Sequence, residues 1–340
     1  MSSLSPKERL LRVLDKKSVD RPPVICTGGM MNAAIVEVMT STGNTLPDAH
    51  HEGGLMAALS ADIHAMTGFE NLGIPFCMTV EAELLGSDID FGTLACEPKI
   101  AREIFPSVAQ VEQRDIATML KSGRVVEIIQ AGYRISRQHQ DSPVIGNLTG
   151  PISTAASIVD PVTFLKELRK DPANSHRVLD YVSDLLIAFG REMITNGVTL
   201  ISIGDPTATG EILGPKVFNE FAVPYLNKVI DGIHAAGAPV IVHICGKIQS
   251  VKHSLPHLRA NAISTDALVN LRVLKEEFPQ LTTMGNVSTF MLELTEAEKV
   301  ARHTAQLVKD GINIIAPACG LSTATTLTAI RAMTDTVKEQ

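Results

Sequence analysis

The sequence predicts an α/β fold, a (β/α)8 TIM barrel with an N-terminal helix and an insertion in its early part. Eight short apolar segments recur along the 340 residues, and each closes on a glycine or a polar turn. Longer segments with helical periodicity separate most of them. Val240–Val242 is apolar at consecutive positions, as in a parallel strand covered on both faces. Several helical segments end at a glycine before the next strand (Gly197, Gly237, Gly311), which suits a left-handed C-cap.

The first 20 residues are predicted to form a helical extension that precedes the barrel. Ser5 can cap the helix, Pro6 suits its first position, and Glu8 stands three residues after the cap. The helix is expected to end before residues 20–23, where two consecutive prolines favour extended backbone leading into the first strand.

The remaining elements follow from the apolar runs and the periodic segments between them. The eight predicted strands are Val24–Cys26, Ile74–Val80, Val144–Leu148, Leu200–Ile203, Val240–Ile244, Ala262–Thr265, Leu281–Met284 and Ile312–Ala316. The predicted connecting helices are Phe164–Lys170, Arg177–Thr195, Val217–Ala236, Leu271–Phe278, Glu296–Asp310 and Ala324–Lys338.

The early part of the chain is longer than a regular barrel requires. Residues 36–73 and 82–143 each hold more than one crossover helix, and residues 81–92 with 94–100 are interpreted as a hairpin-like insertion. No repeat, low-complexity tract or linker divides the chain, so residues 1–340 are predicted to form one domain. A doubly wound open sheet stays possible, because periodicity does not distinguish it from a closed barrel.

The composition argues against a nucleic-acid-binding, a disulfide-rich or a membrane-spanning protein. The net charge of −7, without a basic block interleaved with aromatic residues, argues against nucleic acid as a partner. Five irregularly spaced cysteines do not form the pattern of a disulfide framework. Neither a signal peptide nor an apolar run of about 18 residues is evident, so a cytoplasmic protein without a membrane span is expected.

Three soft ligands follow two of the predicted strands. His243 and Cys245 are two residues apart at a strand end, so both side chains point to the same side of it. Cys319 follows the last predicted strand, and a barrel brings both strand ends to the same rim. Imidazole and thiolates are ligands that zinc favours, and three protein ligands leave one coordination position open. The alternative for a His-x-Cys pair alone is chance, with the cysteines acting as small buried apolar residues.

Several other residues at predicted strand ends are candidates for the site. Asp266 could act at the site as a temporary fourth ligand, or it could cap a helix or bond at the rim. Glu81 could be a ligand or a proton acceptor, or a solvated acid beside Glu83. Asp205 could orient a substrate or, more simply, hold its loop.

The segments PVIVHICG and APACGLS, which contain the three ligands, resemble the methylated-corrinoid:coenzyme M methyltransferases of the uroporphyrinogen decarboxylase superfamily. SPKERLLRVLDKKSVDRPPV and GIPFCMTVEAELLGSDIDFG are similar to further blocks of that superfamily, so the resemblance covers nearly the whole chain. It implies that His243, Cys245 and Cys319 bind zinc.

The resemblance also implies a reaction and its partners. A methyl group would move from a methylated corrinoid, presented by a corrinoid protein, to the thiol of coenzyme M, as in methanogenesis from methanol or methylamines. The glycine turns at Gly28, Gly29 and Gly150 could border the corrinoid. The alternatives are a zinc methyltransferase with another acceptor, a non-catalytic zinc protein, and a uroporphyrinogen decarboxylase. The decarboxylase carries an arginine-rich loop where this chain has residues 27–32 without arginine.

Overall fold

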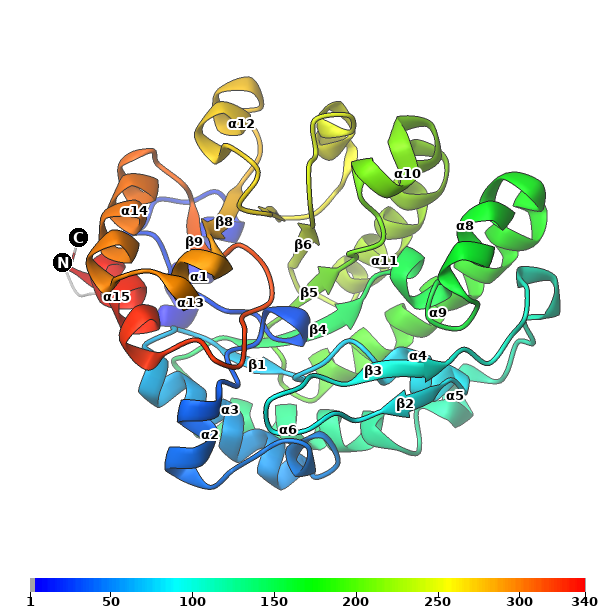
Figure 1. Ribbon diagram of the computed structural model, residues 1–340, viewed down its shortest axis with the longest axis horizontal. Coiled ribbons are helices and arrows are strands. Elements are labelled where there is room, and N and C mark those ends of the chain that lie inside the picture. The colour runs from blue at the N-terminus through cyan, green and yellow to red at the C-terminus, as the bar shows by residue number, and fades with distance from the viewer. Residues whose placement is uncertain (1–3, 340) are drawn as a thin grey trace.

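The computed structural model describes residues 4–339 and contains a parallel seven-stranded sheet that curls on itself (Figure 1). The strands run in the order β1-β4-β5-β6-β7-β8-β9. Their bounds are β1 Leu72–Ile74, β4 Val144–Thr149, β5 Leu200–Gly204, β6 Val240–Ile244, β7 Ala262–Thr265, β8 Thr283–Val287 and β9 Ile314–Pro317. Every residue of β4 to β9 is buried, as expected for parallel strands with both faces covered.

The first predicted strand, Val24–Cys26, takes the eighth position without forming a regular strand. Val24 makes an isolated parallel bridge with Ile315 of β9. On the other side, the Asn71 side chain accepts from the Cys26 N–H and donates to its carbonyl oxygen, both at 2.8 Å. The segment therefore lies between β9 and β1, and a side-chain amide replaces part of the backbone ladder there.

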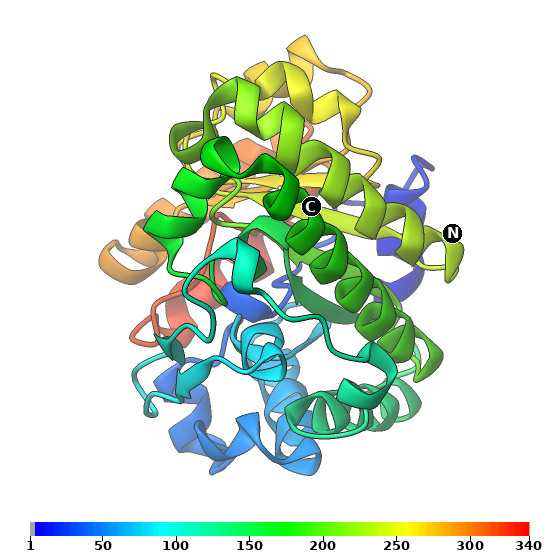
Figure 2. The same ribbon diagram turned by 90° about the vertical axis from the view of Figure 1, so that its right-hand side faces the viewer.

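Helices follow the strands along the chain and surround the sheet (Figures 1 and 2). The main helices are α3 Gly53–Thr67, α6 Arg124–Gln138, α8 Pro161–Lys170, α9 Pro172–Thr195, α10 Gly210–Val217, α11 Val223–Ala235, α12 Leu271–Glu277, α14 Ala297–Lys309 and α15 Leu327–Lys338. Shorter helices are α2 Val36–Thr42, α4 Val80–Leu85, α5 Ile116–Met119, α7 Pro151–Ala155 and α13 Thr289–Leu294. No helix in the described part is long and apolar enough to cross a membrane.

The early insertion contains both a helix and a hairpin. The predicted strand Ile74–Val80 is wrong beyond its first residue, because β1 ends at Ile74, Pro75 has no N–H to continue a ladder, and α4 begins at Val80. The antiparallel pair β2 Asp88–Asp90 and β3 Lys99–Arg102 follows, close to the predicted hairpin.

The N-terminal helix α1 (Pro6–Leu14) has the predicted cap, with the Ser5 hydroxyl accepting from the Glu8 N–H at 3.2 Å. Its apolar face packs against one set of side chains inside the barrel. The packed residues are Leu10, Val13 and Leu14 of α1 with Ile25, Met31, Ile145, Leu200, Ile241, Ala262, Met284, Ile314 and Ala316. Most of these lie at or near the starts of their strands, so α1 closes the N-terminal end of the barrel.

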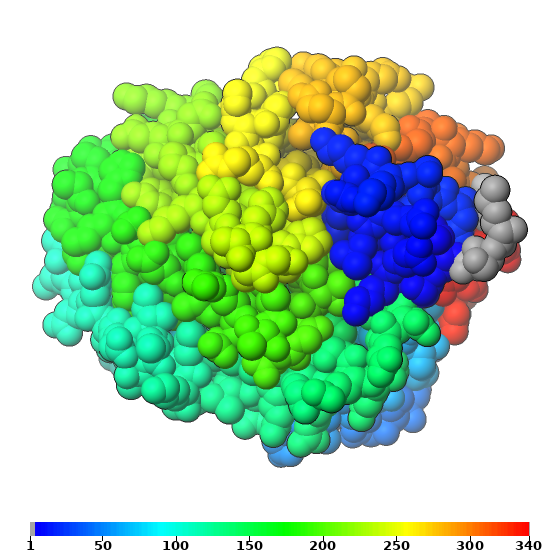
Figure 3. Space-filling model, turned by 180° about the vertical axis from the view of Figure 1, so that it is seen from behind, coloured from blue at the N-terminus to red at the C-terminus, as the bar shows by residue number. Residues whose placement is uncertain are grey.

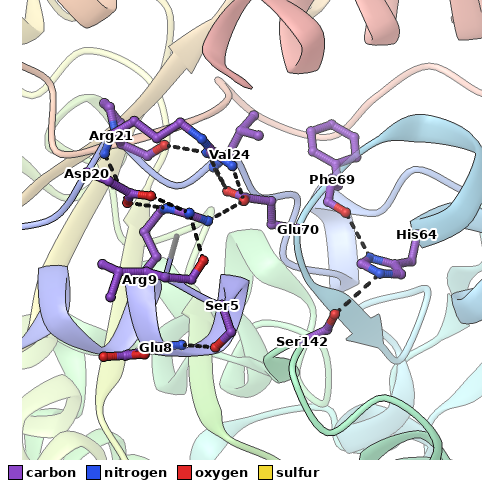
Figure 4. A network of polar contacts seen from close by, with 12 residues as sticks. Ser5, Glu8, Arg9, Asp20, Arg21, Val24, His64, Phe69, Glu70 and Ser142 are labelled. Atoms are coloured by element: carbon purple, nitrogen blue, oxygen red, sulfur yellow. Dashed lines mark hydrogen bonds and ion pairs between the residues drawn. The ribbon is translucent and has the colours of Figure 1, made fainter. Parts of the chain in front are cut away.

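A buried ionic network fixes the segment after α1 to the barrel (Figure 4). The Arg9 guanidinium, 3% exposed, donates to Asp20 and Glu70, each at 2.7 Å. Arg21 also donates to Glu70, and the Glu70 carboxylate accepts from the Val24 N–H. The blue N-terminal segment covers part of the surface seen from behind in Figure 3.

Side chains further along the same strands are polar. Two residues beyond the apolar layer, on strands β4 to β8, stand Asn147, Ser202, His243, Ser264 and Asn286, which are all buried. The interior therefore changes from apolar to polar toward the carboxyl ends of the strands, where active sites of barrel enzymes lie.

Candidate metal centre

His243 and Cys245 are held at the carboxyl end of β6. Ile241 points into the apolar layer, so the two-residue period of a strand turns His243 and then Cys245 to the same side. His243 is buried, Cys245 is half-buried just past the strand end, and the His243 Nε2 atom lies 3.1 Å from Cys245 Sγ. The strand thus delivers an imidazole and a thiol to one point.

Cys319 reaches the same point from β9. It follows the strand end at Pro317, and its Sγ lies 3.7 Å from Cys245 Sγ. The ligand atoms of His243, Cys245 and Cys319 all lie within 4.8 Å of one another. Residues 74 positions apart in the sequence are therefore brought together, as the placement of both on one barrel rim predicts.

The two thiols share a hydrogen bond that shifts their pKa values in opposite directions. The hydrogen bond with Cys245, followed by contacts with His243 and the Gly320 N–H, lowers the pKa of the Cys319 thiol against the opposing effect of burial. The same bond and burial raise the pKa of Cys245. Of the two thiols, Cys319 is therefore the more acidic.

Two residues of β7 and its following turn border the cluster. The Ser264 hydroxyl lies 2.9 Å from His243 Nδ1, because the two residues are register partners in β6 and β7. The Asp266 carboxylate accepts from the Leu268 N–H at 3.0 Å and the Gly246 N–H at 3.4 Å. The structure therefore shows hydrogen bonds at the barrel rim, which was one of the alternatives for Asp266. The contact of Ser264 with His243 is one that sequence reasoning missed.

Glu81 lies in the first turn of α4 rather than at a strand end, so its predicted placement is wrong. It is buried, which also excludes the alternative of a solvated acid. Its carboxylate accepts from the Thr149 N–H at 2.8 Å and the Thr149 hydroxyl at 2.9 Å. Burial raises the pKa of Glu81 to about 7, although the Thr149 bonds oppose that rise.

Asp205 binds the first turn of α7, the short helix that follows β4. Its carboxylate accepts from the Ile152 N–H, the Ser153 N–H and the Ser153 hydroxyl, at 3.1, 2.8 and 2.6 Å. A Cβ atom added at Gly150 would lie 2.4 Å from the Asp205 Cβ. The glycine at position 150 thus leaves room for the Asp205 side chain.

The glycine pair after the first barrel segment accommodates another side chain. Gly28 has φ +129°, and a Cβ atom added there would lie 2.7 Å from Asn147 Nδ2. The Gly29 N–H donates to the Pro75 carbonyl at 2.8 Å. These contacts explain the glycines by backbone conformation and close packing, and a corrinoid contact at Gly28, Gly29 or Gly150 stays a prediction.

Comparison with known proteins identifies the family. The family model described as uroporphyrinogen decarboxylase (URO-D) matches residues 5–340. The chain belongs to this family. The resemblance described from the sequence is confirmed, and the fold with it.

Relatives within the family include methyltransferases and decarboxylases. The chain is 30% identical over 340 residues to a methylcobamide:CoM methyltransferase, MtbA, of Methanosarcina acetivorans, and covers 99% of each chain. It is 27% identical over 339 residues to MtaA of Methanosarcina barkeri, with 98% of this chain and 97% of that protein covered. A solved methyltransferase from Methanosarcina mazei superimposes with a TM-score of 0.92 at 26% identity, over 99% of both chains.

Proposed function

We propose that this chain is a zinc-dependent methyltransferase that moves a methyl group from a methylated corrinoid to the thiol of coenzyme M. The observation that carries the proposal is the convergence of His243 Nε2, Cys245 Sγ and Cys319 Sγ at the carboxyl end of the barrel. The names of the relatives support the donor and the acceptor, since MtbA and MtaA are both called methylcobamide:CoM methyltransferases. A corrinoid protein is then the partner that brings the donor.

The three residues fit a zinc ion. Two sulfurs at about 2.3 Å from one tetrahedral zinc stand about 3.8 Å apart, and the Cys245 and Cys319 sulfurs are 3.7 Å apart. His243 supplies the nitrogen, and its other ring nitrogen already has a partner in Ser264. A set of three protein ligands leaves one position for a substrate.

Zinc supplies one kind of chemistry here, since a thiol that coordinates it loses its proton and becomes nucleophilic at neutral pH. The residues of the chain decide how nucleophilic that sulfur stays. Cys245 and Cys319, as two thiolates, cancel the double positive charge of the ion, and His243 adds a neutral ligand. At the carboxyl end of the barrel, Cys245 and Cys319 are partly exposed while His243 is buried, so a methylated corrinoid can be presented to the two sulfurs from above.

Two alternatives have specific observations against them. A closed, non-catalytic site would need a fourth protein ligand, but the cluster of ligand atoms within 4.8 Å of one another contains only His243, Cys245 and Cys319 among the described residues, and the Asp266 carboxylate instead accepts from the Gly246 and Leu268 N–H groups. A decarboxylase would need arginines free to bind carboxylates. Arg124, buried next to the segment after β1, donates to Cys77, Thr79 and Glu83 instead.

The proposal is tested by removing the metal and one ligand at a time. Protein stripped with a chelator, and the Cys319→Ser variant, are expected to transfer methyl groups from free methylcobalamin to coenzyme M more than about 100-fold slower than zinc-loaded protein. Cys96→Ser, which alters an exposed cysteine, serves as the matched control and should keep the full rate. Undiminished transfer by the metal-free protein would refute the mechanism.

A second measurement separates an open site from a closed one. X-ray absorption of the zinc-loaded protein is expected to show one additional sulfur ligand when coenzyme M is added. An unchanged ligand set would favour the structural zinc protein. The proposed location is the cytoplasm, because Cys245 and Cys319 have to stay reduced to hold a metal. That residues 1–340 form one domain stays a prediction.

A further inference from the structure

A hydroxyl group on β7 contacts the ring of the candidate ligand His243. Ser264 Oγ lies 2.9 Å from His243 Nδ1, and Ser264 is fully buried. The two residues are register partners on adjacent parallel strands, so neither can move without disturbing the ladder between β6 and β7. A rigid part of the barrel therefore holds this bond.

We propose that Ser264 is a positioning residue that fixes the orientation of His243 and supplies the hydrogen-bond acceptor that its metal-binding form needs. The inference rests on the proposed zinc function. A neutral imidazole can coordinate a metal through Nε2 only if its proton is on Nδ1. The Ser264 oxygen then accepts that proton in a hydrogen bond, and the ring presents its Nε2 lone pair toward Cys245 and Cys319.

The chemistry of a hydroxyl suits this position better than that of a carbonyl or a carboxylate. Without a metal, Nε2 lies 3.1 Å from Cys245 Sγ and can carry the ring proton toward that sulfur. Nδ1 then needs a donor, and the Ser264 O–H provides one. When Nε2 becomes a ligand the proton moves to Nδ1, and the same hydroxyl turns from donor to acceptor. Ser264 thus satisfies the buried ring in both forms.

Loss of this partner has a defined cost. With alanine at position 264, the metal-binding form of His243 would carry a buried Nδ1 proton without an acceptor from this strand, and the ring would lose the contact that fixes its orientation. Removing such an outer partner of a metal-bound histidine typically weakens the affinity for the metal by about 10- to 100-fold. The ligands themselves would be unchanged, so zinc would still bind with the same three atoms.

The test uses the full chain with Ser264→Ala and, as matched control, Ser202→Ala. Ser202 is 2% exposed and lies on β5, so Ser202→Ala deletes the same atom from a buried strand, and no hydrogen bond joins the Ser202 hydroxyl to His243 in the described residues. Zinc affinity is measured by competition with a chromophoric chelator. Nitrogen-15 NMR of histidine-labelled, zinc-loaded protein reports which ring nitrogen of His243 carries the proton and whether that proton is hydrogen-bonded.

Ser264→Ala is expected to bind zinc about 10- to 100-fold more weakly and to lose the hydrogen-bonded Nδ1 signal, while Ser202→Ala matches the wild type in both measurements. Ser264→Thr, which keeps the hydroxyl, should retain the signal and most of the affinity. Equal zinc affinity and an unchanged His243 signal in Ser264→Ala would overturn the inference and leave the zinc site standing. Failure of the wild-type protein to bind zinc would instead refute the proposed function.

Discussion

Glu81→Gln is expected to stabilise the protein above neutral pH and to flatten the dependence of its stability on pH. Glutamine is nearly the same size and carries no charge. Its amide oxygen can accept from the Thr149 N–H, and its NH2 group can donate to the Thr149 hydroxyl, which is free to donate to the Met78 carbonyl. The substitution therefore removes a buried charge and keeps the hydrogen bonds.

The magnitude follows from the pKa of Glu81, which burial raises from 4.5 to about 7. Between these two values the folded protein holds a proton that the unfolded chain has released, so stability falls as the pH rises through this window. At about 1.4 kcal/mol per pH unit, the full difference is about 3 kcal/mol. A chain of 340 residues has an unfolding entropy of about 0.7 kcal/mol/K, so this corresponds to about 4 °C in Tm.

The assay is thermal and urea unfolding of the two chelator-treated proteins between pH 5 and pH 8. The Tm of Glu81→Gln relative to the wild type should increase steadily with pH and level off near pH 8. Glu293→Gln, which removes an exposed carboxylate, is the control and should show no such trend. A constant difference between Glu81→Gln and the wild type across this range would refute the reasoning, because Glu81 would then ionise alike in both states.

Two further substitutions test the packing that holds the site. Arg9→Met should lower the free energy of unfolding in urea by about 3 kcal/mol, because the buried Glu70 carboxylate would keep only Arg21 as an ion-pair partner. Arg12→Met, on the exposed face of α1, is the control and should lower it by less than about 0.5 kcal/mol. Similar losses for both arginines would contradict this difference. Gly150→Ala should lower the free energy of unfolding by about 1 to 3 kcal/mol, because the added Cβ atom would lie 2.4 Å from the Asp205 Cβ. Gly54→Ala is the control and should be neutral or stabilising, because its Cβ atom would meet only the flexible end of the Arg134 side chain. An unaffected Tm for Gly150→Ala would show that the Asp205 loop moves aside freely.

The sequence predicts the strands best where the apolar signal is continuous. β6 and β7 have the predicted bounds, Val240–Ile244 and Ala262–Thr265, because both faces of each strand are buried and every position is constrained. The Val24–Cys26 segment has the same apolar character but only one backbone bridge. On its other side it is bound by Glu70 and by the Asn71 side chain, contacts about 45 positions away that no local pattern reveals.

In the candidate site too, some contacts could be predicted from local patterns in the sequence and others could not. The convergence of His243, Cys245 and Cys319 is predictable because it needs only the two-residue period of a strand and the common rim of a barrel. The contact between His243 and Ser264 depends on the register between neighbouring strands, which the sequence does not specify. Glu81 was misplaced because Ile74–Val80 reads as one apolar run, although the chain turns into a helix at Val80.

The closure of the N-terminal end of the barrel by α1 has a consequence for how substrates reach the site. In the described residues, Leu10, Val13 and Leu14 fill the N-terminal end together with the first inward layer of the strands. In the proposed methyl transfer, the small thiol and the bulky methyl donor would then both approach from the carboxyl end. A carrier protein seated over that end would stand in the path of the thiol, so binding of the thiol before the carrier is the expected order of addition.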